Sequence, residues 1–79
     1  MPTAIVLINT EISFETDVLK ELKKVEGVND ASGVYGLYDI VAQVQSDTMD
    51  HLKEILTYRI RRLDKVRSTL TMIVVKERE

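Results

Sequence analysis

Ser32-Gly33-Val34-Tyr35-Gly36-Leu37-Tyr38-Asp39-Ile40-Val41-Ala42 is the stretch of sequence in which two strand-like runs meet across a turn. The run before the turn, residues 28–35, is a strand of modest quality because polar residues and a glycine dilute it. The run after the turn, residues 38–45, alternates in the period-two pattern of a pleated strand. Gly36 can adopt the positive φ that a tight turn requires, so the stretch predicts a β-hairpin that presents a tyrosine and a carboxylate side by side.

Upstream of the hairpin, the sequence predicts a strand followed by a helix. Residues 4–8 are aliphatic and largely β-branched, and they are too few for a helix, so they predict a strand covered on both faces. Ser13 can cap a helix whose apolar residues recur at helical spacing as far as Val25. Gly27 then provides a left-handed stop.

Downstream of the hairpin, a second helix and a last strand are expected. Asp47 is the expected N-cap, and the apolar spacing predicts a helix that ends near Arg61 or Arg62. Residues 66–76 predict a strand that is rich in β-branched residues on both sides, and residues 76–79 predict a frayed, charged tail.

The predicted order is strand, helix, strand, strand, helix, strand. This is the βαββαβ order of an α+β ferredoxin-like fold, in which a four-stranded antiparallel sheet carries both helices on one face. A chain of 79 residues forms one domain. Because the first and last strands are apolar on both sides, we expect the uncovered sheet face to pack on a second copy and form a homodimer.

Composition excludes several classes of function. Eleven basic and thirteen acidic side chains give a formal net charge of -2, which offers no global attraction to nucleic acid or anionic lipid. The amino-terminus has no basic leader, and no apolar run approaches the roughly 20 residues that span a bilayer. We therefore expect a cytoplasmic protein that contacts neither nucleic acid nor membrane directly.

No group of residues predicts a reaction. His51, the one histidine, has no nucleophile beside it and is interpreted as a packing or surface residue. Asp47 and Asp50 are explained by helix capping rather than by metal binding. The basic segment 58–67 suits the last turn of a helix and is interpreted as a solvated face. We expect no catalytic residue, metal or cofactor, and no enzymatic activity.

Residue chemistry leaves two interpretations of the turn at residues 35–39. In the first, it is a plain hairpin in which Asp39 hydrogen-bonds the turn. In the second, exposed backbone N–H groups receive a carboxylate while Asp39 pairs with an ammonium group. A ligand that carries both charges at that spacing is an α-amino acid.

The hairpin and the last strand also carry a family resemblance. Gly36-Leu37-Tyr38-Asp39, Ile40-Val41-Ala42, an amphipathic helix and the strand from Val66 to Val74 follow one another. Together they resemble the effector domain, called RAM, of the Lrp/AsnC (feast/famine) transcription regulators, which has a G-x-Y-D-like turn and a final V-x-S/T-T-x-T-x-I-V strand. The resemblance covers residues 4–76. The helix-turn-helix that usually precedes this domain is absent, so residues 1–79 are similar to the stand-alone RAM proteins, with no DNA-binding domain.

The resemblance implies an oligomeric sensor. Family members dimerise through their sheets, and the dimers form rings, often octamers, with amino-acid effectors bound between neighbouring dimers. It implies that the turn contributes to the ligand site and that hydroxyl groups of the last strand complete it. The ligand-binding residues implied in this way are Gly36, Tyr38, Asp39, Ser68, Thr69 and Thr71. The implied role is to sense an amino acid and to modulate full-length Lrp/AsnC regulators by mixed assembly.

Three alternatives share the predicted fold. An ACT-like regulatory subunit would also bind amino acids, normally as an appendage of an enzyme. A small dimeric α/β-barrel enzyme, such as a monooxygenase or isomerase, would need an enclosed pocket with inward-pointing polar side chains. The third alternative is an assembly module that has no ligand.

Overall fold

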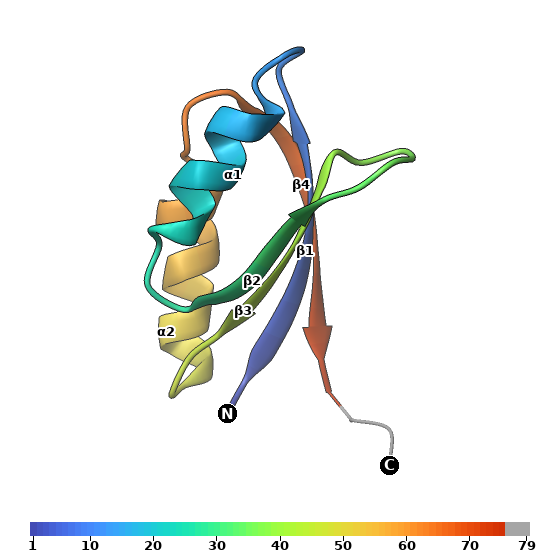
Figure 1. Ribbon diagram of the computed structural model, residues 1–79. Coiled ribbons are helices and arrows are strands. Elements are labelled where there is room, and N and C mark those ends of the chain that lie inside the picture. Colours follow the sequence, from blue (N-terminus) through green and yellow to red (C-terminus); the bar gives the residue numbers. More distant parts are fainter. Residues whose placement is uncertain (76–79) are drawn as a thin grey trace.

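The computed structural model describes residues 1–75, which form one antiparallel sheet with the helices on one face (Figure 1). The strand order in this four-stranded sheet is β2-β3-β1-β4. The predicted ferredoxin-like α+β fold is therefore confirmed. The elements in chain order are β1 (Thr3–Thr10), α1 (Glu15–Lys23), β2 (Val28–Gly33), β3 (Ile40–Gln45), α2 (Met49–Glu54), the π-helical segment η1 (Ile55–Ile60) that continues α2, and β4 (Val66–Val74).

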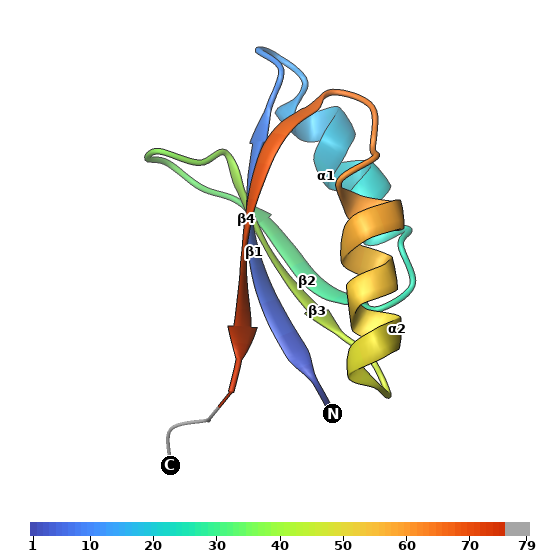
Figure 2. The same ribbon diagram turned by 180° about the vertical axis from the view of Figure 1, so that it is seen from behind.

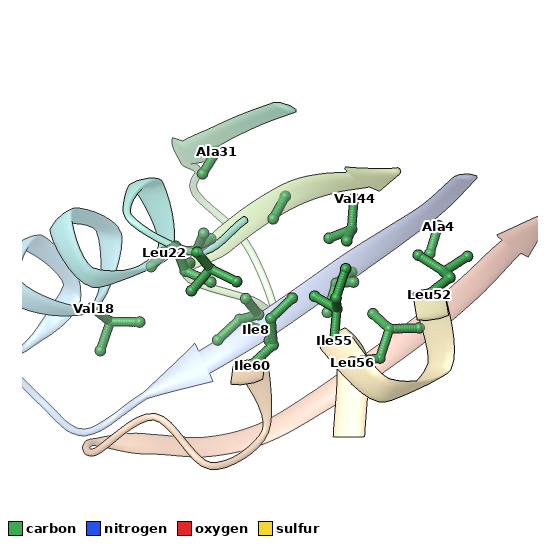
Figure 3. Packing of buried hydrophobic residues seen from close by; sticks show 14 residues of the cluster. Ala4, Ile8, Val18, Leu22, Ala31, Val44, Leu52, Ile55, Leu56 and Ile60 are labelled. Atoms are coloured by element: carbon green, nitrogen blue, oxygen red, sulfur yellow. The ribbon is translucent and has the colours of Figure 1, made fainter. Parts of the chain in front are cut away.

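The hydrophobic core lies between the sheet and the helices (Figure 3). Every second residue of β1 and β3 faces the helices, because successive side chains of a strand point to opposite sides. The register pairs Val6 with Ala42 and Ile8 with Ile40, so the two buried rows adjoin. The fully or almost fully buried members are Ala4, Val6, Ile8, Ile40, Ala42 and Val44 of the sheet and Val18, Leu22, Leu52 and Ile60 of the helical segments.

Two predicted helix caps are wrong. Ser13 has a positive φ of 74° and does not cap α1; Phe14 occupies the N-cap position without a side-chain cap. The turn is closed instead by the Phe14 N–H, which donates to the Glu11 carbonyl at 3.0 Å. At α2 the cap is Thr48, whose hydroxyl accepts from the His51 N–H at 3.1 Å, and not Asp47.

The predicted ends of the other helices and strands agree with the structure to within a few residues. Gly27 has the predicted positive φ, at 97°, but it lies in the turn before β2, three residues beyond the C-cap Lys24, so it does not itself end α1. The second helix is extended by η1 as far as Ile60, which is one residue short of the predicted end. The predicted strands were too long, because β2 ends at Gly33 and β3 begins at Ile40. The expected strand residue Lys76 and the tail to residue 79 lie outside the described residues.

The face of the sheet opposite the helices is apolar and open. Leu7 pairs with Val41 on one side and with Leu70 on the other, and Ile5 pairs with Met72. These five residues, here called the open-face row, point away from the core. Leu70 and Met72 are each 46% exposed. No element formed by residues 1–75 covers this face (Figure 2).

Candidate functional site

The hairpin between β2 and β3 projects from the sheet, away from the helices (Figures 1 and 2). Its base is closed by the Val34 N–H, which donates to the Asp39 carbonyl at 2.9 Å. Gly36 has a φ of 134°, so the positive φ predicted for it is confirmed. At the tip, Tyr35 and Leu37 are fully exposed or nearly so. The hairpin therefore presents apolar side chains outward while its base stays tied to the sheet.

Asp39 anchors the hairpin to β1. Its Oδ2 accepts from the Thr10 N–H at 2.9 Å and from the Thr10 hydroxyl at 3.3 Å. Its own N–H donates to the Ile8 carbonyl at 3.0 Å. The carboxylate thus bonds the neighbouring strand and not the turn itself. An ionised carboxylate has about four acceptor positions, so this half-buried group keeps capacity for a ligand.

A surface hollow of about 460 Å³ lies beside Asp39 at the end of the sheet, and we call it the sheet-end hollow. One cation, two carboxylates and neutral polar groups line it. Asn9 Nδ2 donates to Ser68 Oγ at 3.5 Å across its floor. The lining residues are Asn9, Thr10, Ile12, Glu15, Asp39, Arg67 and Ser68. Because groups of both charges face a single hollow, it suits a small zwitterion.

A second hollow of about 360 Å³ adjoins the first and lies under the hairpin. We call it the hairpin hollow. Glu15 and Asp39 line both hollows, so the two share a carboxylate wall. The other lining residues of the hairpin hollow are Gly33, Val34, Tyr35 and Gly36.

A third and larger hollow, of about 560 Å³, shares Ile12 and Arg67 with the sheet-end hollow. Lys65 lies on its wall with Nζ 4.6 Å from the centre of the Phe14 ring. None of the residues predicted as ligand-binding lines this third hollow.

A β-bulge explains how Arg67 and Ser68 come to line one hollow. In a regular strand, consecutive side chains point to opposite faces. In β4 the partners of Asn9 and Thr10 are Ser68 and Val66, so Arg67 is skipped in the register. Such an extra residue bends the strand and re-aims its side chain.

The structure brings some of the predicted site residues together and separates others. Asp39 and Ser68 share the sheet-end hollow, and Gly36 and Asp39 share the hairpin hollow. Tyr38 is half-buried next to Asp39 and lines none of the three hollows. Thr69 and Thr71 pair with Ile8 and Val6, whose side chains face the core. Their hydroxyl groups therefore lie on the other side of β4 from Ser68.

Sequence reasoning missed five residues that line the sheet-end hollow: Asn9, Thr10, Ile12, Glu15 and Arg67. Arg67 belongs to the basic segment 58–67, which suits the last turn of any helix and therefore gives no signal of a ligand site. The polar end of the first strand was a usable signal, because its neighbours in the sheet are the hairpin base and the start of β4.

The remaining candidates form no further site. His51 and Asp50 are exposed at the start of α2. Within residues 1–75, no group of three or more His, Cys, Asp or Glu residues could hold a metal ion. In that same part of the chain, no helix has the length and apolar character that a bilayer span requires.

The fold and the mixed-charge hollow are those expected of a small ligand-binding domain. The family model described as the Lrp/AsnC ligand binding domain matches residues 3–79. The chain therefore belongs to the Lrp/AsnC ligand-binding domain family, as its sequence motifs predicted. Domains of this family bind amino-acid effectors and oligomerise.

Three similar proteins differ in how much of their own length the match to this chain covers. The crystal structure of FFRP-DM1 is 35% identical with a TM-score of 0.91, and the match covers 95% of this chain and 100% of that one. AsnC of E. coli is 25% identical with a TM-score of 0.89, and the match covers 96% of this chain and 52% of AsnC. Homocitrate synthase of Saccharolobus solfataricus is 36% identical over 64 residues, or 81% of this chain. The chain spans only 14% of the length of that enzyme.

Proposed function

We propose that this chain is a non-enzymatic sensor that binds an amino acid at the sheet-end hollow and acts through assembly with other copies. The observation that carries the proposal is the placement of Arg67 and Asp39 on the walls of one hollow. An α-amino acid presents a carboxylate and an ammonium group a short distance apart, so both of its charges find partners there.

Four residues that line the hollow have a stated role in this proposal: Arg67, Ser68, Asp39 and Thr10. Arg67 and the Ser68 hydroxyl donate to the ligand carboxylate, and Asp39 accepts from its ammonium group. Thr10 fixes the Asp39 carboxylate before the ligand arrives, which lowers the entropic cost of binding. Gly36 leaves the hairpin backbone accessible. Tyr38, Thr69 and Thr71 remain in the predicted ligand-binding set, and the direction of the two threonine side chains favours a supporting role for them.

Assembly is the second part of the proposal. The open-face row gives a second copy an apolar surface, and pairing two such faces would bury it. We infer a homodimer formed through the sheets, with dimers joined into a higher oligomer such as an octamer. The exposed hairpin tip, beside the ligand hollows, favours a contact between dimers at the ligand. Mixed assembly with full-length Lrp/AsnC regulators in the cytoplasm would then carry the amino-acid signal to transcription.

The match to homocitrate synthases favours a second candidate function. There, a segment similar to this chain belongs to a much longer enzyme. The same ligand site would then regulate a catalytic partner, as expected of an ACT-like regulatory subunit. Native mass spectrometry distinguishes the two. Mixed rings with a full-length regulator support the first role, and a complex with a biosynthetic enzyme instead supports the second.

A thermal-shift screen against the twenty amino acids tests ligand binding. A ligand at 100 times its Kd adds about 2.7 kcal/mol to the free energy of unfolding per site, which raises the Tm measurably. We expect one or a few amino acids to raise the Tm. If none does so at millimolar concentration, the sensor proposal is wrong and a ligand-free assembly module is favoured.

A further inference from the structure

We propose that the effector is a basic amino acid of the lysine, ornithine or arginine class. This inference rests on the proposed amino-acid site and names its ligand more closely. It follows from the distribution of charge over the sheet-end and hairpin hollows, which form one continuous surface along Glu15 and Asp39.

The α-groups of an amino acid leave one lining charge unmatched. Among the described residues that line the sheet-end hollow, Arg67 is the one cation, and it pairs with the α-carboxylate. Asp39 pairs with the α-ammonium group. Glu15 then lacks a ligand partner, and among residues 1–75 it forms no ion pair, since the Lys24–Glu21 contact at 3.3 Å involves neither group of this site. The unmatched carboxylate favours a second positive charge on the ligand.

The hairpin hollow matches the side chain of such a ligand. None of the described residues that line it is basic, and Glu15 and Asp39 are its charged members. Val34 and Tyr35 supply apolar surface against which an aliphatic stem can lie. The hollows of about 460 and 360 Å³ are of the size that small-molecule sites require.

This arrangement predicts an order of affinity. A basic side chain in the hairpin hollow has Glu15 as a charged partner and the apolar surface of Val34 and Tyr35 beside it. A neutral side chain of the same length contacts the apolar surface of the hairpin hollow but makes no ion pair with Glu15. An acidic side chain meets two carboxylates and is repelled. We therefore expect affinity to fall from L-lysine to L-norleucine, which has an aliphatic side chain without the charge, and then to L-glutamate.

Isothermal titration calorimetry of the full chain with these three ligands tests the inference. An exposed ion pair contributes up to about 1 kcal/mol, so the wild type should bind L-lysine about five-fold more tightly than L-norleucine. Glu15→Gln should reduce this ratio to about one, because it removes the charge that favours L-lysine over L-norleucine. Glu54→Gln, which removes an exposed carboxylate from α2, is the matched control and should keep the wild-type ratio.

The outcomes separate this inference from the proposed function. If L-norleucine binds as tightly as L-lysine to the wild type, or Glu15→Gln keeps the ratio, the basic-ligand inference is wrong while the amino-acid site stands. If no amino acid binds, both are wrong. A measurement that needs no variant is the salt dependence of the wild type: the lysine preference should shrink between low and high salt, and a preference that does not change contradicts the ion pair with Glu15.

Discussion

Asp39→Asn is the substitution that most directly tests the site. It keeps the shape of the side chain and removes its charge. In the wild type, Asp39 Oδ2 accepts from the Thr10 N–H at 2.9 Å and from the Thr10 hydroxyl at 3.3 Å. The short bond to the amide carries most of the interaction. An Asn side-chain oxygen can still accept that bond, but without charge assistance.

The expected losses follow from this geometry. Hydrogen bonds to charged groups contribute about 1.5–3 kcal/mol and neutral ones about 0.5–1.5, so the free energy of unfolding should fall by about 1 kcal/mol. The ligand ammonium loses its charged partner, so amino-acid affinity should fall about tenfold or more. The variant therefore separates a small effect on stability from a large effect on binding.

Urea unfolding and isothermal titration calorimetry measure the two effects on the same preparation. Asp47→Asn is the matched control, because Asp47 is exposed and Thr48 caps α2 in its place. It should leave both quantities unchanged. Wild-type affinity in Asp39→Asn would refute the ligand role of Asp39. A loss of several kcal/mol in stability would instead mean that the carboxylate serves chiefly to hold the hairpin.

Four further substitutions test the assembly and the fold. Met72→Glu places a charge in the open-face row, and light scattering after size exclusion should then give a 9.0 kDa monomer if this face forms the proposed homodimer; a persistent dimer would exclude this face as the interface. Gly27→Ala should lose more than about 2 kcal/mol in urea unfolding, because the backbone is left-handed and the new Cβ would lie 2.8 Å from Ile55 Cδ1. Gly33→Ala, whose nearest such contact is 3.9 Å, should lose under about 1 kcal/mol, and equal losses would refute this explanation. Thr48→Ala should cost about 1 kcal/mol through the lost cap, and no change would show that another residue caps α2.

The fold was predictable because its signals are local. The alternation of residues 38–45 predicts that Ile40, Ala42 and Val44 lie on the same side of a strand, and all three are buried against the helices. The caps were less predictable because neighbouring residues compete. Asp47 and Thr48 both cap helices well, and the extended backbone of Thr48, with φ -130° and ψ 157°, decides between them.

The ligand hollow could not be predicted to the same extent, because its residues meet only through β1. Asp39 is positioned by Thr10, and Ser68 lies beside Asn9, so both contacts depend on the same end of that strand. The motif around the last strand groups Ser68 with Thr69 and Thr71. The pleat of a regular strand, however, sends the two threonines to the other face.

Arg67 shows why the last-strand motif alone does not identify the residues that line the hollow. By the alternation of β4 alone, Arg67 would face away from Ser68 and could not share its hollow. The register skips Arg67 between the pairs Asn9–Ser68 and Thr10–Val66, so β4 has one residue more than β1 at this point. That bulge lies at the end of the strand, beyond the open-face row and the core rows, where a break in the ladder disturbs neither surface. The same sheet can therefore keep a regular core, leave an apolar face open for a second copy, and still direct a guanidinium toward the hollow that contains Asp39.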